Sequence, residues 1–137
     1  MKPYQHQVQY YETDKMGITH HSNYIRWMEE ARVAFLAEIG WGYDTLEASG
    51  IFSPVTAVQC SYKASTTFAD LIQITLSVLA CNGIKLKLRY EMRKADGTLV
   101  CEAFSEHCFL NEAGQLLRLQ KEHPAFYQAL HDLIKES

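Results

Sequence analysis

The residues best suited to carry chemistry lie between Tyr10 and Arg32, in the run YYETDKMGITHHSNYIRWMEEAR. Asp14 stands in a turn, Asp-Lys-Met-Gly, and the pair His20 and His21 directly precedes a helical pattern. The first backbone N–H groups of a helix have no partner inside the helix, and one that points at a carbonyl group stabilises a developing oxyanion. A nearby carboxylate serves as general base or as nucleophile. This segment is therefore the candidate site for chemistry on a carbonyl group.

The same residues also have simpler explanations. Asp is common in turns that contain Gly, where its side chain bonds to nearby backbone groups, and histidines are frequent near helix starts. Taken alone, the residues favour a plain turn at Asp14 over a catalytic carboxylate. Two adjacent histidines also occur in metal sites, but no acidic or sulfur ligand lies nearby at a diagnostic spacing. We therefore predict no metal site.

Hydrophobic periodicity predicts the elements that position these residues. From residue 4 to residue 10, mainly apolar or aromatic residues alternate with glutamines, which is the period of a strand with one solvated face. After the turn, apolar residues recur every three to four positions, which predicts a long helix that packs on a sheet. Ser22 or Asn23 is expected to cap this helix, and Gly40 and Gly42 are expected to end it.

The second half of the chain has the pattern of long strands. Residues 72–78 and 84–92 alternate between apolar and polar, an Asn-Gly pair separates them, and an Asp-Gly pair precedes a further run over 99–110. Pro124 opens a short C-terminal helix. These elements predict an α+β fold in which an antiparallel sheet wraps around the long helix. We expect that helix to fill the concave side and to leave one chain without a spare cavity.

Composition narrows the class of protein. The chain has 137 residues, 47% hydrophobic and 21% charged, which is typical of one globular domain over residues 1–137. A net charge of −3 gives no basic field for nucleic acid. Neither a signal peptide nor an apolar run of about 18 residues, the length that spans a bilayer, is recognisable. The cysteines form no C-x-x-C pair, and we interpret them as buried free thiols of a cytoplasmic protein.

The segment resembles the signature of the hotdog-fold acyl-CoA thioesterases, of the 4-hydroxybenzoyl-CoA thioesterase and Tol–Pal-associated types. Their pattern is Y-x-x-T-D-x-x-G-x-x-x-H-x-x-Y-x-x-x-x-E-x-x-R. This chain matches the pattern at Tyr10, Thr13, Asp14, Gly17, His21, Tyr24, Glu29 and Arg32. The order of elements extends the resemblance over nearly the whole chain. It implies a hotdog fold and an enzyme that hydrolyses a CoA thioester to a free acid and CoA. No cofactor is implied, since coenzyme A is part of the substrate.

The resemblance also implies a role for each matching position. Asp14 takes the position of the catalytic carboxylate, as general base or nucleophile, and the backbone N–H of His21 polarises the thioester carbonyl. The implied substrate-binding residues are Gly17, His20, Tyr24, Ser61, Tyr62 and Lys63. Another branch of hotdog thioesterases uses a helix glutamate as its catalytic carboxylate, and Glu29 is the alternative here.

Family relatives assemble as homodimers or homotetramers with active sites at the subunit interface. The resemblance therefore implies that residues 60–70 approach Asp14 of the partner. Basic groups are needed for the CoA phosphates, and the candidates are Lys63, Lys85, Lys87, Arg89 and Arg93. For the last four, a solvated strand face is the preferred explanation. Where the family often has Pro, this chain has Ala-Ser-Thr-Thr after Lys63.

Two other classes of function stay open. One is a hotdog protein of another catalytic type, either an acyl-ACP thioesterase or a dehydratase, although dehydratases pair a His with a carboxylate in a different register. The other is a non-catalytic acyl-CoA-binding module. Retention of both Asp14 and His21 argues against pure binding, which needs no carboxylate beside a carbonyl.

Overall fold

The computed structural model describes residues 2–134, which form one curved sheet and a set of helices. The elements are β1 (Tyr4–Gln7), the 3-10 helix η1 (Tyr10–Glu12), α1 (Ser22–Glu38), α2 (Tyr43–Ala48), β2 (Val55–Tyr62), β3 (Leu71–Cys81), β4 (Lys85–Lys94), β5 (Leu99–Cys108), α3 (Leu119–Glu122) and α4 (Pro124–Leu133). The sheet has five strands in the order β1-β3-β4-β5-β2, and every neighbouring pair is antiparallel.

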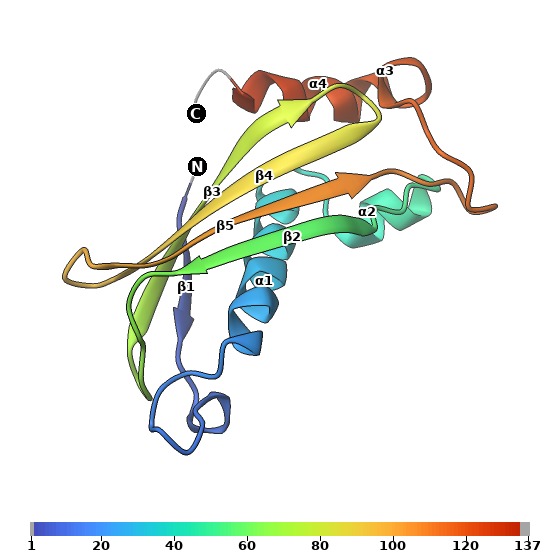
Figure 1. The fold of residues 1–137 in the computed structure, drawn as a ribbon. Helices are drawn as coiled ribbons and strands as arrows, with labels where there is room; N and C mark the ends of the chain where they lie inside the picture. The colour runs from blue at the N-terminus through green and yellow to red at the C-terminus, as the bar shows by residue number, and fades with distance from the viewer. Residues whose placement is uncertain (1, 135–137) are drawn as a thin grey trace.

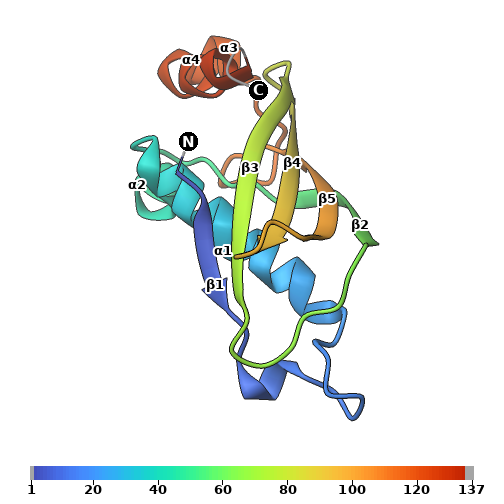
Figure 2. The ribbon, with the colours of Figure 1, turned by 90° about the vertical axis from the view of Figure 1, so that its left-hand side faces the viewer.

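The sheet wraps around α1, as Figure 1 shows, and α4 lies across one end of β3. Figure 2 shows the strands side by side with α1 behind them. This is the α+β arrangement that the sequence predicts. Because β2 pairs only with β5, and β1 only with β3, these two strands form the edges of the sheet.

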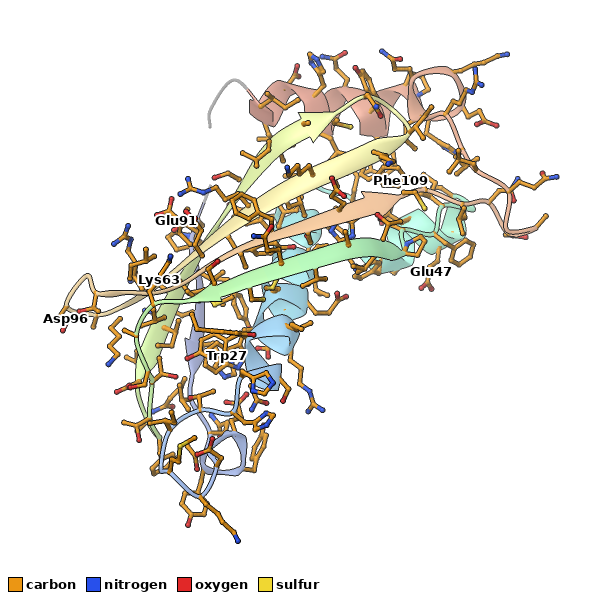
Figure 3. The ribbon with its side chains drawn as sticks, in the orientation of Figure 1. Trp27, Glu47, Lys63, Glu91, Asp96 and Phe109 are labelled. Atoms are coloured by element: carbon orange, nitrogen blue, oxygen red, sulfur yellow. The ribbon has the colours of Figure 1, made fainter. Side chains whose placement is uncertain are left out.

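Side chains on the two faces of the sheet differ as the alternation predicts. On β4, Leu86, Leu88, Tyr90 and Met92 are buried, whereas the residues between them are partly or fully exposed. Figure 3 shows Trp27 on the α1 side of the sheet and Glu91 on the other side. The hydrophobic core therefore lies between the sheet and α1, and the charged strand face is in water.

The start of α1 differs from the prediction of a Ser22 or Asn23 cap. His21 precedes the helix, and its side chain makes no capping hydrogen bond. The Asn23 amide is buried and donates to the carbonyl oxygens of Glu12 at 2.9 Å and His20 at 3.2 Å. Asn23 therefore ties the helix to the preceding loop. At the other end the prediction is confirmed for Gly40, which follows the helix with φ +87°, a left-handed conformation that glycine adopts easily. Gly42 instead directly precedes α2.

The first strand is shorter than the alternation suggests. It ends at Gln7, and residues 10–12 form a 3-10 turn in which Tyr10 and Tyr11 are exposed. The chain bends here because the Glu12 carboxylate accepts a hydrogen bond from the Gln9 backbone N–H at 2.8 Å and so closes the turn.

The expectation that one chain has no spare cavity is wrong. A cavity of about 780 Å³ lies between β1, α1 and β3. Ala31, Ala34 and Ala37 line it from the α1 side, and these small side chains leave the space open. None of the predicted site residues lines this cavity, so it is separate from the candidate site.

Candidate active site

Asp14 lies in a tight turn between η1 and α1. Its backbone carbonyl accepts a hydrogen bond from the Gly17 N–H at 2.9 Å, and its Oδ1 accepts one from the Met16 N–H at 2.8 Å. Gly17 has φ +80°, which a residue with a side chain adopts only with strain. Asp14 therefore forms the turn that the simpler explanation predicts. The hydrogen bond from Met16 also fixes the direction of its half-buried carboxylate.

A second segment of the same chain holds this turn in place. Thr66 is buried, and its carbonyl accepts a hydrogen bond from the Thr19 N–H at 2.9 Å. The two threonine hydroxyls lie 2.5 Å apart, and the Thr66 hydroxyl lies 3.1 Å from the Tyr24 hydroxyl. The Thr67 hydroxyl donates to the Gly17 carbonyl at 2.8 Å. Residues 62–67 therefore pack beside the Asp14 turn of their own chain. The implied approach of residues 60–70 to Asp14 of a partner stays a prediction.

Together the two segments form a pocket of about 360 Å³. Its lining comprises Asp14, Met16, Ile18, Thr19, His21, Tyr24, Tyr62, Lys63, Ala64 and Ser65. Five of the eight predicted site residues, Asp14, His21, Tyr24, Tyr62 and Lys63, thus lie around one space. The other three, Gly17, His20 and Ser61, lie beside the pocket and not in its lining.

The backbone N–H of His21 is free to bind a ligand. On one side of it, the His20 N–H donates to the Glu12 carbonyl at 2.8 Å, and on the other the Ser22 N–H donates to His20 Nδ1 at 3.2 Å. Among residues 2–134, no acceptor is found for the His21 N–H. It therefore combines the position next to α1 with an open hydrogen-bonding site, as an oxyanion donor requires.

Aromatic rings form one side of the pocket. Tyr62 meets Tyr24 edge-on at 5.1 Å between ring centres, and the Tyr62 hydroxyl donates to the His21 carbonyl at 3.3 Å. Desolvation raises the pKa of Tyr62 to about 12, with the Cys60 thiol group adding to the effect. Burial also raises the pKa of Tyr24. Both hydroxyls are therefore protonated at neutral pH and act as hydrogen-bond donors.

Lys63 is the one basic residue in the described lining of the pocket. On the strand face, Arg89 pairs with Glu91 at 3.0 Å and with Glu102 at 2.6 Å, and Arg93 also pairs with Glu91. These arginines are committed to neighbouring carboxylates, which supports the preferred explanation of that face as solvated surface.

Glu29, the alternative catalytic carboxylate, lies outside the pocket lining. Its carboxylate pairs with Arg32 at 3.0 Å and accepts a hydrogen bond from the Tyr43 hydroxyl at 3.3 Å. Arg32 also donates to the Ser53 carbonyl at 3.2 Å. Glu29 therefore belongs to a group of contacts between α1 and the chain that leads to β2.

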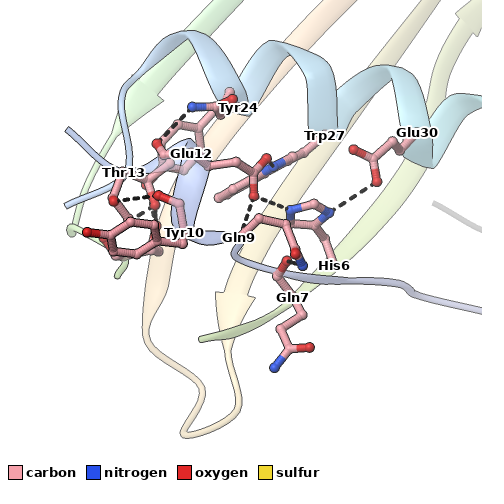
Figure 4. A network of polar contacts seen from close by, with 12 residues as sticks. His6, Gln7, Gln9, Tyr10, Glu12, Thr13, Tyr24, Trp27 and Glu30 are labelled. Carbon is pink, nitrogen blue, oxygen red and sulfur yellow. Dashed lines mark hydrogen bonds and ion pairs between the residues drawn. The ribbon is translucent and has the colours of Figure 1, made fainter. Parts of the chain in front are cut away.

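Sequence reasoning missed Glu12, whose side chain is almost fully buried and lies at the centre of the polar network in Figure 4. Its carboxylate accepts hydrogen bonds from His6 Nε2 and Trp27 Nε1, both at 2.8 Å. Apart from Lys2, Glu12 is the only residue with an acidic or basic side chain other than histidine among the first 13. This isolated acidic residue in an otherwise uncharged stretch is the feature of the sequence that could have pointed to a buried carboxylate.

Three further properties bear on the chemistry. Within the described chain, no cluster of three or more His, Cys, Asp or Glu residues is arranged to hold a metal ion. No helix in residues 2–134 is long and apolar enough to cross a membrane. The four cysteines are free thiols, as predicted, but only Cys81 and Cys101 are buried, and Cys60 and Cys108 are partly exposed.

Comparison with known proteins adds sequence and structural relatives. The chain is 32% identical over 124 residues to YneP of Bacillus subtilis (strain 168), named as a predicted acyl-CoA thioesterase, and the match covers 90% of each chain. It is 26% identical over 96 residues to the acyl-CoA thioester hydrolase YbgC of Escherichia coli O6:H1, covering 70% of this chain and 72% of YbgC. The solved DHNA-CoA thioesterase from Staphylococcus aureus superposes with a TM-score of 0.90 at 27% identity, covering 96% of this chain and 89% of that one.

These likenesses confirm the hotdog fold that the motif predicted. The sequence model of the Thioesterase-like superfamily matches residues 8–130, which include the Asp14 turn, α1 and all of the sheet except β1. The chain therefore belongs to the Thioesterase-like superfamily.

Proposed function

We propose that this protein is an acyl-CoA thioesterase that hydrolyses a CoA thioester to a free acid and CoA, with its chemistry in the Asp14 pocket. One observation carries the assignment of the site: a single pocket is lined by both Asp14 and His21, and no acceptor is found among the described residues for the His21 N–H. Membership of the superfamily and the names of the relatives support thioester hydrolysis as the reaction.

In the proposed mechanism, the thioester carbonyl oxygen accepts a hydrogen bond from the His21 N–H, which stabilises the oxyanion as the carbonyl carbon is attacked. Asp14 either removes a proton from the attacking water or attacks the carbon itself and forms an anhydride that water then hydrolyses. In both routes water supplies the hydroxyl of the acid, and the departing sulfur receives a proton to become the CoA thiol.

The remaining lining residues have binding roles in this proposal. The Lys63 ammonium offers a cation to the CoA phosphates at the pocket. Tyr24 and Tyr62 give an aromatic wall for the thioester part of the substrate. Gly17, His20 and Ser61 support the lining from behind, where His20 packs against His21 with 4.3 Å between ring centres.

We also propose a cytoplasmic homodimer or homotetramer. The edge strand β2 is exposed along most of its length, and Val55, Val58 and Tyr62 are between 41% and 47% exposed. Unpaired strand edges with apolar side chains readily accept a second strand. Free cysteines suit a reducing compartment. Light scattering on the purified protein measures the assembly directly, and a monomer at every concentration would contradict this part.

The main test is release of free thiol from short, medium, long and aromatic acyl-CoAs, alongside the same acyl groups on a carrier protein. We expect turnover of at least one CoA thioester, and Asp14→Asn should lower kcat by about 100-fold or more. Asp132→Asn, an exposed change on α4, is the matched control and should keep wild-type kcat.

Each alternative gives a different result. Turnover of carrier-protein thioesters alone would favour an acyl-ACP thioesterase, and hydration or dehydration of an acyl chain would favour a dehydratase. Binding of acyl-CoA without turnover of any thioester would favour the non-catalytic module and overturn the enzyme proposal. Wild-type activity in Asp14→Asn would move the carboxylate role to Glu29.

A further inference from the structure

The Glu12 carboxylate is a buried acceptor with three donors around it. Oε1 accepts from the Gln9 N–H and from His6 Nε2, and Oε2 accepts from Trp27 Nε1, each at 2.8 Å. Burial acts to raise the pKa of Glu12, but these hydrogen bonds outweigh it and hold the pKa below its ordinary value. The ionised carboxylate is thus the form that the surroundings select, and it fastens η1 to the middle of α1.

The backbone of the same residue reaches the start of α1. The Glu12 carbonyl accepts from the His20 N–H at 2.8 Å and from the Asn23 amide at 2.9 Å. His20 is one residue before His21, and Asp14 is two residues after Glu12. Glu12 therefore connects Asp14 with the His20–His21 peptide, and its contacts set the distance between these two parts of the proposed site.

His6 continues the network from Glu12 to Glu30, as Figure 4 shows. Its Nδ1 lies 3.1 Å from Glu30 Oε1, which also accepts from the Tyr4 hydroxyl at 2.7 Å. Both ring nitrogens face carboxylates, so only the doubly protonated ring donates to both. The ring also packs on Trp27, with 4.7 Å between ring centres.

We propose that Glu12 is a positioning residue for thioester hydrolysis: it holds the His20–His21 peptide at a fixed distance from Asp14. The inference rests on the proposed function of the pocket. Glu12 does not line the pocket. Its carboxylate acts through Gln9 and Trp27, which fix the turn, and the turn places the backbone carbonyl that binds His20 and Asn23. Because its contacts set the reacting geometry and not the binding surface, its loss should lower kcat with little change in KM.

The decisive variant is Glu12→Gln, which keeps the size of the side chain. Glutamine has one oxygen, so its NH₂ group must face one of the donors that now bind the carboxylate. Glu30→Gln is the matched control, because the hydrogen bonds of Glu30 with Tyr4 and His6 both use a single oxygen that glutamine retains. Both variants share His6 as a neighbour, but only the Glu12 carboxylate binds Trp27 of α1 and the Gln9 N–H that closes η1. That turn carries the Glu12 carbonyl, which holds the His20 N–H and the Asn23 amide.

We expect Glu12→Gln to lower kcat by about 10- to 100-fold and to change KM by less than about 3-fold. Hydrogen exchange provides a readout that needs no activity: the His20 amide should exchange at least about 10-fold faster, while amides of β4 keep wild-type rates. Glu30→Gln should stay within about 2-fold of wild type in both measurements. Asn23→Leu, which removes only the amide contacts, should lower kcat in the same direction if Glu12→Gln does not fold.

Wild-type kcat in Glu12→Gln would overturn the inference, and so would an equal loss in Glu30→Gln. A lower kcat with unchanged exchange at His20 would also overturn it, because the effect would then not pass through this peptide. If the wild-type protein hydrolyses no thioester, the proposed function fails by itself, and the exchange experiment still decides whether Glu12 holds the His20–His21 peptide.

Discussion

A buried histidine makes the stability of this protein sensitive to acid. His107 on β5 is 1% exposed, and its Nε2 lies 2.7 Å from the Ser105 hydroxyl, which lies 2.7 Å from the Tyr90 hydroxyl. Nδ1 has no hydrogen-bond partner among the described residues. Burial, with a smaller contribution from the positive charge of Arg32, lowers the pKa of His107 from 6.5 to about 3.

The sign and size of the effect follow from linkage. Below pH 6.5 the unfolded chain binds a proton at His107, whereas the folded chain does so only near pH 3. The contribution of neutral His107 to the free energy of unfolding is therefore fully present above pH 6.5, and it is lost as the pH falls toward 3. Between pH 7.5 and 5.0, about 1.5 pH units of this window are crossed, which corresponds to about 2 kcal/mol of the free energy of unfolding.

His107→Leu removes this dependence while keeping an apolar side chain of similar size in the core. At pH 7.5 we expect a change within about 1 kcal/mol, because the variant loses one hydrogen bond to Ser105 and also an unsatisfied nitrogen. When the pH is lowered from 7.5 to 5.0, wild type should lose about 2 kcal/mol of the free energy of unfolding that the variant keeps. Urea unfolding followed by circular dichroism at the two pH values measures both quantities.

Ser105→Ala is the control, because it disturbs the same cluster without removing a titrating group. It should lower stability by about 1–3 kcal/mol at both pH values, since it leaves the Tyr90 hydroxyl and the His107 nitrogen without their partner. Its dependence on pH should match wild type. Equal pH dependence of wild type and His107→Leu would refute the reasoning.

Three further predictions concern the site. Thr66→Val should lower the free energy of unfolding by about 1–3 kcal/mol, because it leaves the hydroxyls of Thr19 and Tyr24 without a shared partner; an unchanged urea midpoint would contradict this. Lys63→Gln should raise KM for acyl-CoA several-fold at low salt, and the effect should shrink as added salt screens the CoA phosphates. A change in KM that does not depend on salt would argue against contact between Lys63 and the phosphates. Glu29→Gln should keep kcat within about 2-fold, because its carboxylate is held in an ion pair outside the pocket lining, and a loss of two orders of magnitude in steady-state assays would make it the catalytic carboxylate.

The sheet was predictable because its pattern is local and repetitive. Along β3 and β4 every second residue is apolar, and an Asn-Gly pair joins the two strands, so neither strand nor turn depends on distant contacts. The β1 boundary was missed for the opposite reason. The Glu12 carboxylate accepts a hydrogen bond from the Gln9 N–H and so bends the chain, although the alternation in the sequence continues to Tyr10.

The site was predictable in part. The motif places Asp14 and His21 in the sequence, and the structure puts both in one pocket. The partners that hold them were not predictable, because Thr66 and Thr67 join the turn across 47 and 50 positions of sequence. The prediction that Ser22 or Asn23 caps α1 failed for a similar reason. The Asn23 amide donates to carbonyl oxygens of Glu12 and His20, and the preference of Asn for helix starts gives no information about such contacts.

The strand order also dictates when the pocket can exist during synthesis of the chain. Strand β2, which carries Tyr62 and leads into Thr66, is held in the sheet only by β5, and β5 ends at Cys108. A nascent chain that has emerged only as far as Gly97 contains every residue of the pocket lining but has no neighbour for β2. The site is therefore among the last parts to form, after about four-fifths of the polypeptide has been made, as expected for contacts of high sequence separation.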